Sequence, residues 1–116
     1  MIIFSEPFAK NVDAGKRFMV AYLKGLRDYN DSFVKNQGKK EIVDILAKHS
    51  PVKDPKLYDK IDMPFLDPDG KMSREAMKAD IDYFLKSGYV GGKLTLEDIM
   101  DAQFIEYASG QLGPYR

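Results

Sequence analysis

One long amphipathic segment, between Val12 and Val34, constrains the fold more than any other part of the sequence. Its apolar residues recur in steps of three and four, which is the spacing of one face of an α-helix. Asn11 is placed to cap this helix, and Asp13 suits the positive end of the helix dipole. The segment therefore predicts one long helix with an apolar face that other parts of the chain must cover. The residues of this face are Phe18, Met19, Tyr22, Leu23, Leu26, Tyr29 and Phe33.

Two glycines, Gly15 and Gly25, lie inside this predicted helix. Each weakens a helix by about 1 kcal/mol relative to alanine. A glycine has no side chain, so it lets a neighbouring element approach the helix closely. We expect such an approach at both positions.

Shorter helices follow the long one. A second helix spans about residues 40–49 and ends at Ser50-Pro51, because the residue before a proline avoids helical backbone. Asp54-Pro55 is typical of a helix start and predicts a short helix that ends near Ile61. Residues 62–72 contain two prolines and a glycine, so they are expected to form one long irregular segment.

Two helices with clear caps close the chain. Ser73 predicts the start of the first, and Gly88 suits the left-handed residue that follows its end. Thr95 predicts the start of the second, which ends near Gly110, and Asp98 is in position for a capping box. In the later helices the residues expected to face inward are Ile42, Val43, Ile45, Leu46, Met77, Ile81, Phe84, Leu85, Leu96, Ile99, Met100, Gln103, Tyr107 and Ala108.

The fold class follows from these elements. The chain has 116 residues, which is the length of a single domain. Ile2-Ile3-Phe4 is the only candidate strand and has no visible partner, and Ser5-Glu6-Pro7 after it indicates a turn or a helix start. We predict a mainly α fold, one domain over residues 1–116, with about five helices and at most one short N-terminal strand.

Charge and residue counts exclude several classes of function. Eighteen basic and eighteen acidic residues cancel, which argues against a nucleic-acid partner. The sequence has no cysteine, which excludes disulfides and a cysteine nucleophile, and its single histidine, His49, excludes multi-histidine metal sites. The longest apolar run, Met1 to Phe4, is far shorter than the ~20 residues of a membrane-spanning helix. We therefore expect no nucleic acid, no membrane insertion and no cofactor.

Two loop motifs resemble binding sites but lack essential residues. Asp67 to Ser73 looks like half of a calcium-binding loop, yet Phe65 and Ala76 stand where that loop requires acidic ligands. Gly88 to Lys93 lacks the first glycine and the final Ser or Thr of a phosphate-binding loop, and it follows a helix. We interpret the first motif as a polar turn before the next helix and the second as a helix-to-helix connection.

No residue is marked for catalysis. His49 stands at the end of a predicted helix, where the helix dipole favours a cation. A catalytic histidine needs a nucleophile and an orienting acid, and the sequence marks neither. We predict no catalytic residue, no metal-binding residue, and a protein that is not an enzyme.

Four stretches stand out together: residues 18–30 (FMVAYLKGLRDYN), 45–49 (ILAKH), 66–70 (LDPDG), and an ending made of 88–90 (GYV) and 112–115 (LGPY). In this order they resemble the C-terminal third of periplasmic substrate-binding proteins of ABC transporters. The similar branch is the nitrate, sulfonate and taurine type, which is related to the proteins of thiamine-pyrimidine synthesis. The resemblance covers nearly the whole chain.

The resemblance implies an architecture. Members of this family have two α/β lobes joined by crossover strands, bind their ligand in the cleft between the lobes, and pack C-terminal helices on the first lobe. Residues 1–8 would be the end of a crossover, and the rest a helical cap packed as an incomplete lobe. Ser5, Glu6 and Phe8 lie near the expected hinge and are the candidate ligand-binding residues. Most ligand contacts in the family come from the first two-thirds, which this sequence does not contain.

The resemblance also implies a function. Intact members capture a small solute without catalysis, here an anion such as a sulfonate or nitrate, and deliver it to an ABC permease. Their location is the periplasm. No secretory signal is present in the printed sequence, so a chain complete as printed is expected in the cytoplasm.

Two other functions remain open. The first is a stand-alone helical module that self-associates or binds another protein. Because exposed apolar patches beyond a few hundred Å² usually have a partner, we expect a homo-oligomer, with exchange of a terminal helix as one route. The second is an enzyme related to the thiamine-pyrimidine branch. It would need a reactive histidine in a formed pocket, for which His49 is a poor candidate.

Overall fold

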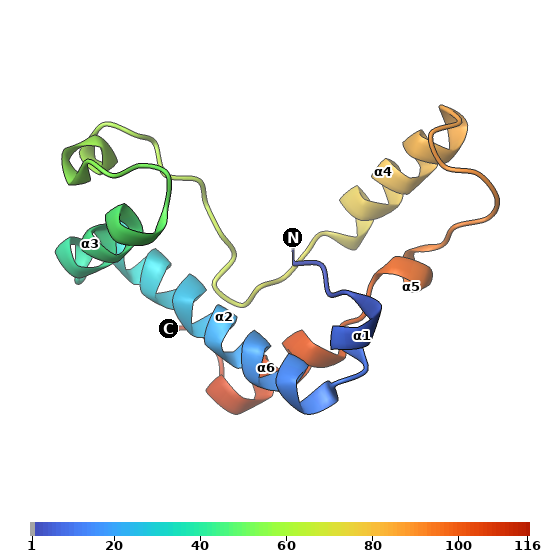
Figure 1. Cartoon of the computed structure of the whole chain (residues 1–116), viewed down its shortest axis with the longest axis horizontal. Coiled ribbons are helices and arrows are strands. Elements are labelled where there is room, and N and C mark those ends of the chain that lie inside the picture. Colours follow the sequence, from blue (N-terminus) through green and yellow to red (C-terminus); the bar gives the residue numbers. More distant parts are fainter. Residues whose placement is uncertain (1) are drawn as a thin grey trace.

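A 22-residue helix, α2 (Val12–Phe33), is the axis of the computed structural model, which describes residues 2–116 (Figure 1). The C-terminal helix α6 (Gln103–Leu112) packs along α2. The short helix α1 (Glu6–Ala9) and the helix α3 (Lys39–His49) also pack against α2. The fold is mainly α, as predicted, and no residue from 2 to 116 lies in a strand.

The main core lies between α2 and α6. Leu23 and Ala108 are fully buried there, and Leu26 is nearly so. A second, smaller core joins α3 to the 3-10 helix η1 (Pro55–Asp59). Its buried residues are Val43, Ala47 and Tyr58.

Two arms diverge from α2 (Figure 1). One consists of α3 and η1, and the other of α4 (Arg74–Lys86) and α5 (Leu96–Ile99). Among the described helices, α4 and α5 pack against each other and against no other helix. The radius of gyration is therefore 17.0 Å, against about 13 Å for a compact domain of this length. None of the helices described is long and apolar enough to cross a membrane.

The predicted helix caps are confirmed. The side chain of Asn11 accepts the backbone N–H of Ala14 at 3.2 Å, and that of Ser73 accepts the N–H of Ala76 at 3.1 Å. Gly88 has a φ of 72°, the left-handed conformation predicted after α4. At α5 the carboxylate of Asp98 accepts the Thr95 N–H at 2.8 Å. Hydrogen bonds from the Thr95 hydroxyl and this N–H lower the pKa of Asp98.

The candidate strand at residues 2–4 is not formed. Ile2 and Ile3 are exposed, and no neighbouring strand in residues 2–116 offers a hydrogen-bonding edge. Phe4 instead packs edge-on against Phe8, Phe18 and Phe104, with ring centroids 4.8–5.5 Å apart. We call Phe4, Phe8, Phe18 and Phe104 the aromatic cluster. Met1, the first residue of the crossover that the resemblance implies for residues 1–8, lies outside the described residues.

The single last helix predicted from Thr95 is wrong, because the chain breaks between α5 and α6. Met100 has extended backbone angles, and just before α6 the side chain of Asp101 accepts the N–H of Gln103 at 3.0 Å. The break changes which side chains face α2. Phe104 is 3% exposed although it was not expected to face inward, whereas Ile99 and Tyr107 are exposed. In all, five residues predicted to face inward on the later helices are exposed: Ile45, Phe84, Ile99, Gln103 and Tyr107.

The two glycines of α2 differ in their surroundings. A Cβ on Gly15 would stand 2.5 Å from Cε1 of Phe104, so the predicted close approach is confirmed there. Nothing lies within 4 Å of a Cβ on Gly25, so the same prediction is wrong at that position.

This difference predicts opposite effects for two alanine substitutions. Gly15→Ala is expected to lower the free energy of unfolding by about 1–3 kcal/mol, because the buried Phe104 ring must shift. Gly25→Ala is expected to raise it by up to about 1 kcal/mol through helix propensity alone. Urea unfolding followed by circular dichroism measures both changes. Changes of the same sign would contradict the packing of Phe104 on α2.

Candidate functional site

Arg27, on α2, has the side chain with the most hydrogen bonds among the described residues, and it reaches the C-terminal end of α6. Its Nε donates to the Pro68 carbonyl at 3.2 Å, and its Nη2 pairs with the Asp69 carboxylate at 2.9 Å. Its Nη1 and Nη2 also donate to the carbonyls of Leu112 and Gly113, at 3.3 and 2.6 Å. One guanidinium, 14% exposed, therefore ties the irregular segment and the C-terminal turn to α2.

Two residues just beyond Arg27 extend this contact along the irregular segment. The Tyr29 hydroxyl donates to the Pro64 carbonyl at 2.7 Å, and burial raises the pKa of this phenol. The buried side-chain amide of Asn30 donates to the Leu66 carbonyl at 2.8 Å. We call Arg27, Tyr29 and Asn30, with the backbone they hold, the Arg27 clamp.

The Asp67–Gly70 stretch is a polar turn, as predicted. The Asp67 carboxylate accepts the N–H groups of Asp69 and Lys71, at 2.9 and 3.2 Å. Gly70 has a φ of 67°, and a Cβ there would stand 2.6 Å from the side chain of Ile105. The acidic residues of the turn are thus engaged in backbone contacts and in the Arg27 pair. Within residues 2–116, no three potential metal-ligating side chains of His, Cys, Asp or Glu come together.

The last residues of the chain are held by a second polar contact with α2. The Tyr115 hydroxyl donates to the Asp31 carboxylate at 2.8 Å. The Lys35 ammonium lies 2.9 Å from the same carboxylate and 3.9 Å from the centre of the Tyr115 ring, and it donates to the Arg116 carbonyl. Hydrogen bonds from Lys35 and then Tyr115 lower the pKa of Asp31, and the contacts with Tyr115 and Asp31 raise the pKa of Lys35.

A pH dependence follows for the end of the chain. Because the folded pKa of Asp31 lies below its unfolded value of about 3.9, the contact stabilises the fold above that pH and is lost as the pH falls through the folded pKa. Carboxyl NMR titration should give a lower midpoint for Asp31 in the wild type than in Tyr115→Phe, which removes one donor. Equal midpoints would contradict the Tyr115 contact.

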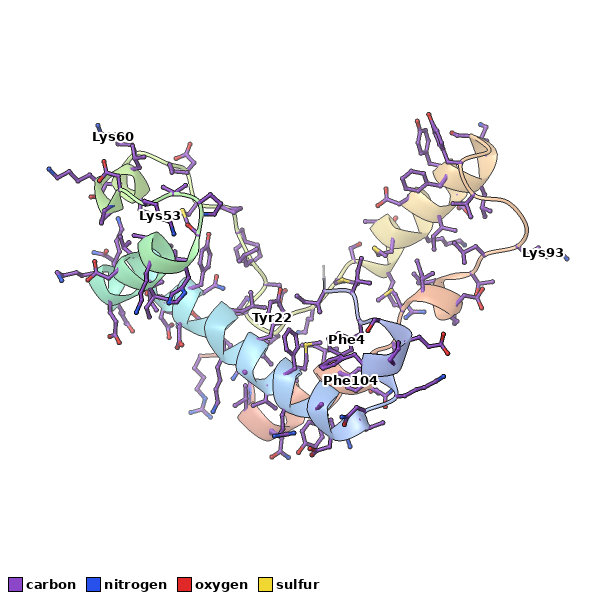
Figure 2. All side chains as sticks on the ribbon, in the orientation of Figure 1. Phe4, Tyr22, Lys53, Lys60, Lys93 and Phe104 are labelled. Carbon is purple, nitrogen blue, oxygen red and sulfur yellow. The ribbon has the colours of Figure 1, made fainter. Side chains whose placement is uncertain are left out.

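The candidate ligand-binding residues lie on or beside α1. Ser5 is exposed and precedes the helix with extended backbone, and Glu6 is exposed and pairs with Lys10 at 2.7 Å. Phe8 packs into the aromatic cluster, 6.0 Å from Phe18. Figure 2 shows Phe4 and Phe104, the centre of this cluster, beside α1. Ser5 and Glu6 are therefore accessible to a solute, whereas the ring of Phe8 anchors α1 to α2.

Two open surface hollows occur elsewhere. One lies at the start of α3 and is lined by Gly38 to Glu41, Asp44, Ile45 and Lys48. The other lies by the C-terminal turn and is lined by Asp69, Lys71, Ser109, Gly110, Gly113 and Pro114. Neither of these two hollows includes Ser5, Glu6 or Phe8.

His49 is the last residue of α3, as predicted, and it is exposed. The hydroxyl of its neighbour Ser50 shares a hydrogen bond of 2.8 Å with the hydroxyl of Tyr58. A nucleophile must be within hydrogen-bond reach of its base, and this hydroxyl is directed to Tyr58. The arrangement therefore serves to join α3 to η1.

Sequence reasoning gave Arg27 no role. It was one of several charges beside the apolar face of α2, and its partners lie 41 to 86 residues away along the chain. Helical periodicity reports only on neighbours within the helix, so it could not have found this residue. The one available indication was that Arg27 lies within the first of the four stretches that resemble a family.

A scan of protein-family models found no match to this chain, and searches of curated proteins and of solved structures found none either.

Proposed function

We propose that this chain is the C-terminal helical part of an ABC-transporter solute-binding protein. The intact protein would capture a small anion, such as a sulfonate or nitrate, and deliver it to a membrane permease from the periplasm. It would do so without catalysis and without a cofactor. The observation that carries the proposal is that residues from three of the four family-like stretches meet in the Arg27 clamp.

The clamp gives those stretches a physical reason to occur together. The first stretch supplies Arg27, Tyr29 and Asn30, the third supplies the turn that begins at Leu66, and the last supplies the carbonyl groups of Leu112 and Gly113. Loss of any one part would leave polar groups without partners. Residues that are far apart in the sequence thus form one structural unit, the Arg27 clamp.

The proposed role of this unit is to hold a rigid helical cap. In that role the clamp fixes the irregular segment and the C-terminus on α2, while the aromatic cluster fixes the N-terminal segment at the other end of α2. Ser5 and Glu6 would then enter the ligand cleft at a defined position, because Phe8 of the same short helix is anchored. Serine hydroxyls donate hydrogen bonds to anions, and Glu6 would orient basic or hydroxyl groups nearby.

Isothermal titration calorimetry tests this proposal. The protein expressed with its upstream reading frame is titrated with taurine, alkanesulfonates, nitrate and aromatic acids, and the 116-residue chain is titrated in parallel. We expect the longer protein to bind one of these solutes with micromolar or tighter affinity, and the 116-residue chain to bind none. Absence of binding by the longer protein would overturn the proposed solute class, and tight binding by the short chain would overturn the placement of the cleft.

Variants of the longer protein sharpen the test. Ser5→Ala combined with Glu6→Gln is expected to weaken solute binding by about tenfold or more. Lys10→Gln is the matched control, because it breaks the same Glu6–Lys10 ion pair without changing a proposed cleft residue. Equal effects of the two changes would contradict a role for Ser5 and Glu6 in the cleft.

A second function, a stand-alone helical module that self-associates in the cytoplasm, is favoured by a different observation. The accessible surface is 8674 Å², whereas a compact monomer of 13.2 kDa has about 6,400 Å². Surface in such excess is typical of a chain that is covered by a partner. Sedimentation velocity of the 116-residue chain from 1 to 100 µM tests this function directly: we expect a dimer or larger oligomer, and a monomer throughout would contradict it.

A further inference from the structure

The arm formed by α4 and α5 is held together by contacts of its own. At its base, Arg74 at the start of α4 pairs with Glu97 of α5 at 2.7 Å, and Ile81 in the middle of α4 is buried. At its outer end, the Tyr89 N–H donates to the Phe84 carbonyl at 3.1 Å, and the two rings pack edge to face with centroids 6.2 Å apart. These contacts join the arm from its base to its outer end.

The same arm has little hold on the rest of the chain. Neither α4 nor α5 packs against any other described helix (Figure 1). Ile81 is the only buried residue of the two helices, so few apolar contacts oppose a displacement of the arm. Parts of a folded protein with few buried apolar contacts are the parts that move at the lowest free-energy cost.

The rest of the chain is fixed close to the two places where the arm leaves it. On the first side, Asp69 pairs with Arg27 at 2.9 Å. The next residue, Gly70, lies so close to Ile105 that a Cβ there would stand 2.6 Å from that side chain. On the second side, Phe104 in the first turn of α6 is 3% exposed. The chain is therefore held at residue 70 and again from the start of α6.

Two short connectors, residues 71–73 and 100–102, join the arm to these fixed points. Ser73 and Met100, where the connectors meet the arm, have extended backbone with ψ angles of 108° and 121°. Among residues 2–116, no hydrogen bond joins one connector to the other or ties either of them to α2. Backbone rotation in the connectors therefore breaks no contact between the arm and α2.

We propose that the arm of α4 and α5 swings as one body about a hinge made of residues 71–73 and 100–102, while α2 and α6 stay fixed. Both connectors reach the arm beside the paired Arg74 and Glu97, so the axis of the motion lies at the base of the arm. Because α4 has 13 residues and is about 20 Å long, a rotation of about 20° displaces its outer end by about 7 Å. A hinge of this kind changes the distance between the two arms without breaking a helix.

Pulsed electron paramagnetic resonance between two spin labels tests the hinge, because the chain has no cysteine of its own. Three pairs share a label at Lys24→Cys on α2, and the second label is at Gln111→Cys on α6, Glu75→Cys at the base of the arm, or Lys86→Cys at its outer end. All four side chains are exposed, so labelling should leave the fold unchanged. We expect a narrow distance distribution for the α2–α6 pair, a wider one for the base pair, and one at least about 7 Å wider than the first for the outer pair.

Two results would overturn the proposal directly. An outer pair as narrow as the α2–α6 pair would show that the arm is fixed, and a base pair as wide as the outer pair would place the motion elsewhere than at the two connectors. Hydrogen exchange separates a swinging arm from an unfolded one. We expect the amides of residues 78–86 in α4 to exchange more slowly than those of residues 91–94 in the following loop, and equal rates would overturn the motion as one body. These measurements use the 116-residue chain without solute, so their outcome is independent of the solute titrations.

Discussion

Replacing Arg27 by methionine is expected to lower the free energy of unfolding by about 2–4 kcal/mol. The substitution removes four contacts of a guanidinium that is 14% exposed. It leaves the partly buried Asp69 carboxylate with only the more distant ammonium of Lys71, 3.6 Å away and largely exposed. It also releases two chain segments from α2 at once. Urea unfolding followed by circular dichroism measures the loss, and hydrogen exchange should show residues 64–70 and 112–116 exposed first.

Arg17→Met is the matched control for this prediction. Arg17 lies on the same helix and pairs with Asp13 at 3.0 Å, but its side chain is 76% exposed. Exposed ion pairs between residues four apart contribute about 0.3–0.5 kcal/mol, so the control should change stability by no more than that. If Arg27→Met cost as little as the control, the clamp would not hold the irregular segment in solution.

Phe104→Ala is the second large effect, with an expected loss of about 3–5 kcal/mol. The ring is 3% exposed, fills the space above Gly15 and packs against Phe4 at 5.1 Å. Removing it opens a cavity between α2 and α6 and takes away the main support of the N-terminal segment. Thermal or urea unfolding measures the loss, and faster hydrogen exchange in residues 4–9 would report the released segment.

Tyr107→Ala on the same helix provides the contrast. Tyr107 is 39% exposed and lies beneath the Lys16 ammonium, 4.7 Å from the ring centre. We expect a loss of at most about 1 kcal/mol, which is the scale of an exposed cation–π contact. The apolar periodicity predicted that Tyr107 faces inward and did not include Phe104. A larger loss of stability in Phe104→Ala than in Tyr107→Ala therefore supports the break at Met100. The reverse order would support one continuous last helix.

The helix starts, and the end of α4, were predictable because the contacts that cap a helix are local. Asn11 and Ser73 accept N–H groups three residues ahead, and Gly88 adopts the left-handed conformation that a glycine adopts most easily. Each of these contacts depends on residues within one turn, and a sequence displays such residues directly. The mainly α fold was predictable for the same reason.

The break in the last helix was hidden by two competing patterns. The apolar spacing from Leu96 to Ala108 is compatible with one helix, whereas Asp101 also has the residue type of a helix start. In the structure the chain breaks before α6, and Phe104 of α6 packs against Gly15 of α2. Contacts of this kind join residues far apart in the sequence, and neither propensity nor periodicity reports them.

The candidate site was also only partly predictable, because its contacts join residues that are far apart in the sequence. Ser5, Glu6 and Phe8 were named from a resemblance, and the structure gives Phe8 a packing role that no local pattern could have predicted. Arg27 was visible only as a charge, since its partners lie on segments that meet only in three dimensions. What the sequence did contain was the ordered set of four stretches, and residues from three of them meet in the Arg27 clamp.

The DNA upstream of the Met1 codon tests most directly whether this chain is the C-terminal part of a solute-binding protein. We predict an in-frame extension that encodes a secretory signal and two α/β lobes. An in-frame stop codon with a ribosome-binding site directly before Met1 would contradict that account. The chain would then be a separate 116-residue protein, and self-association or the binding of another protein would become the function to pursue.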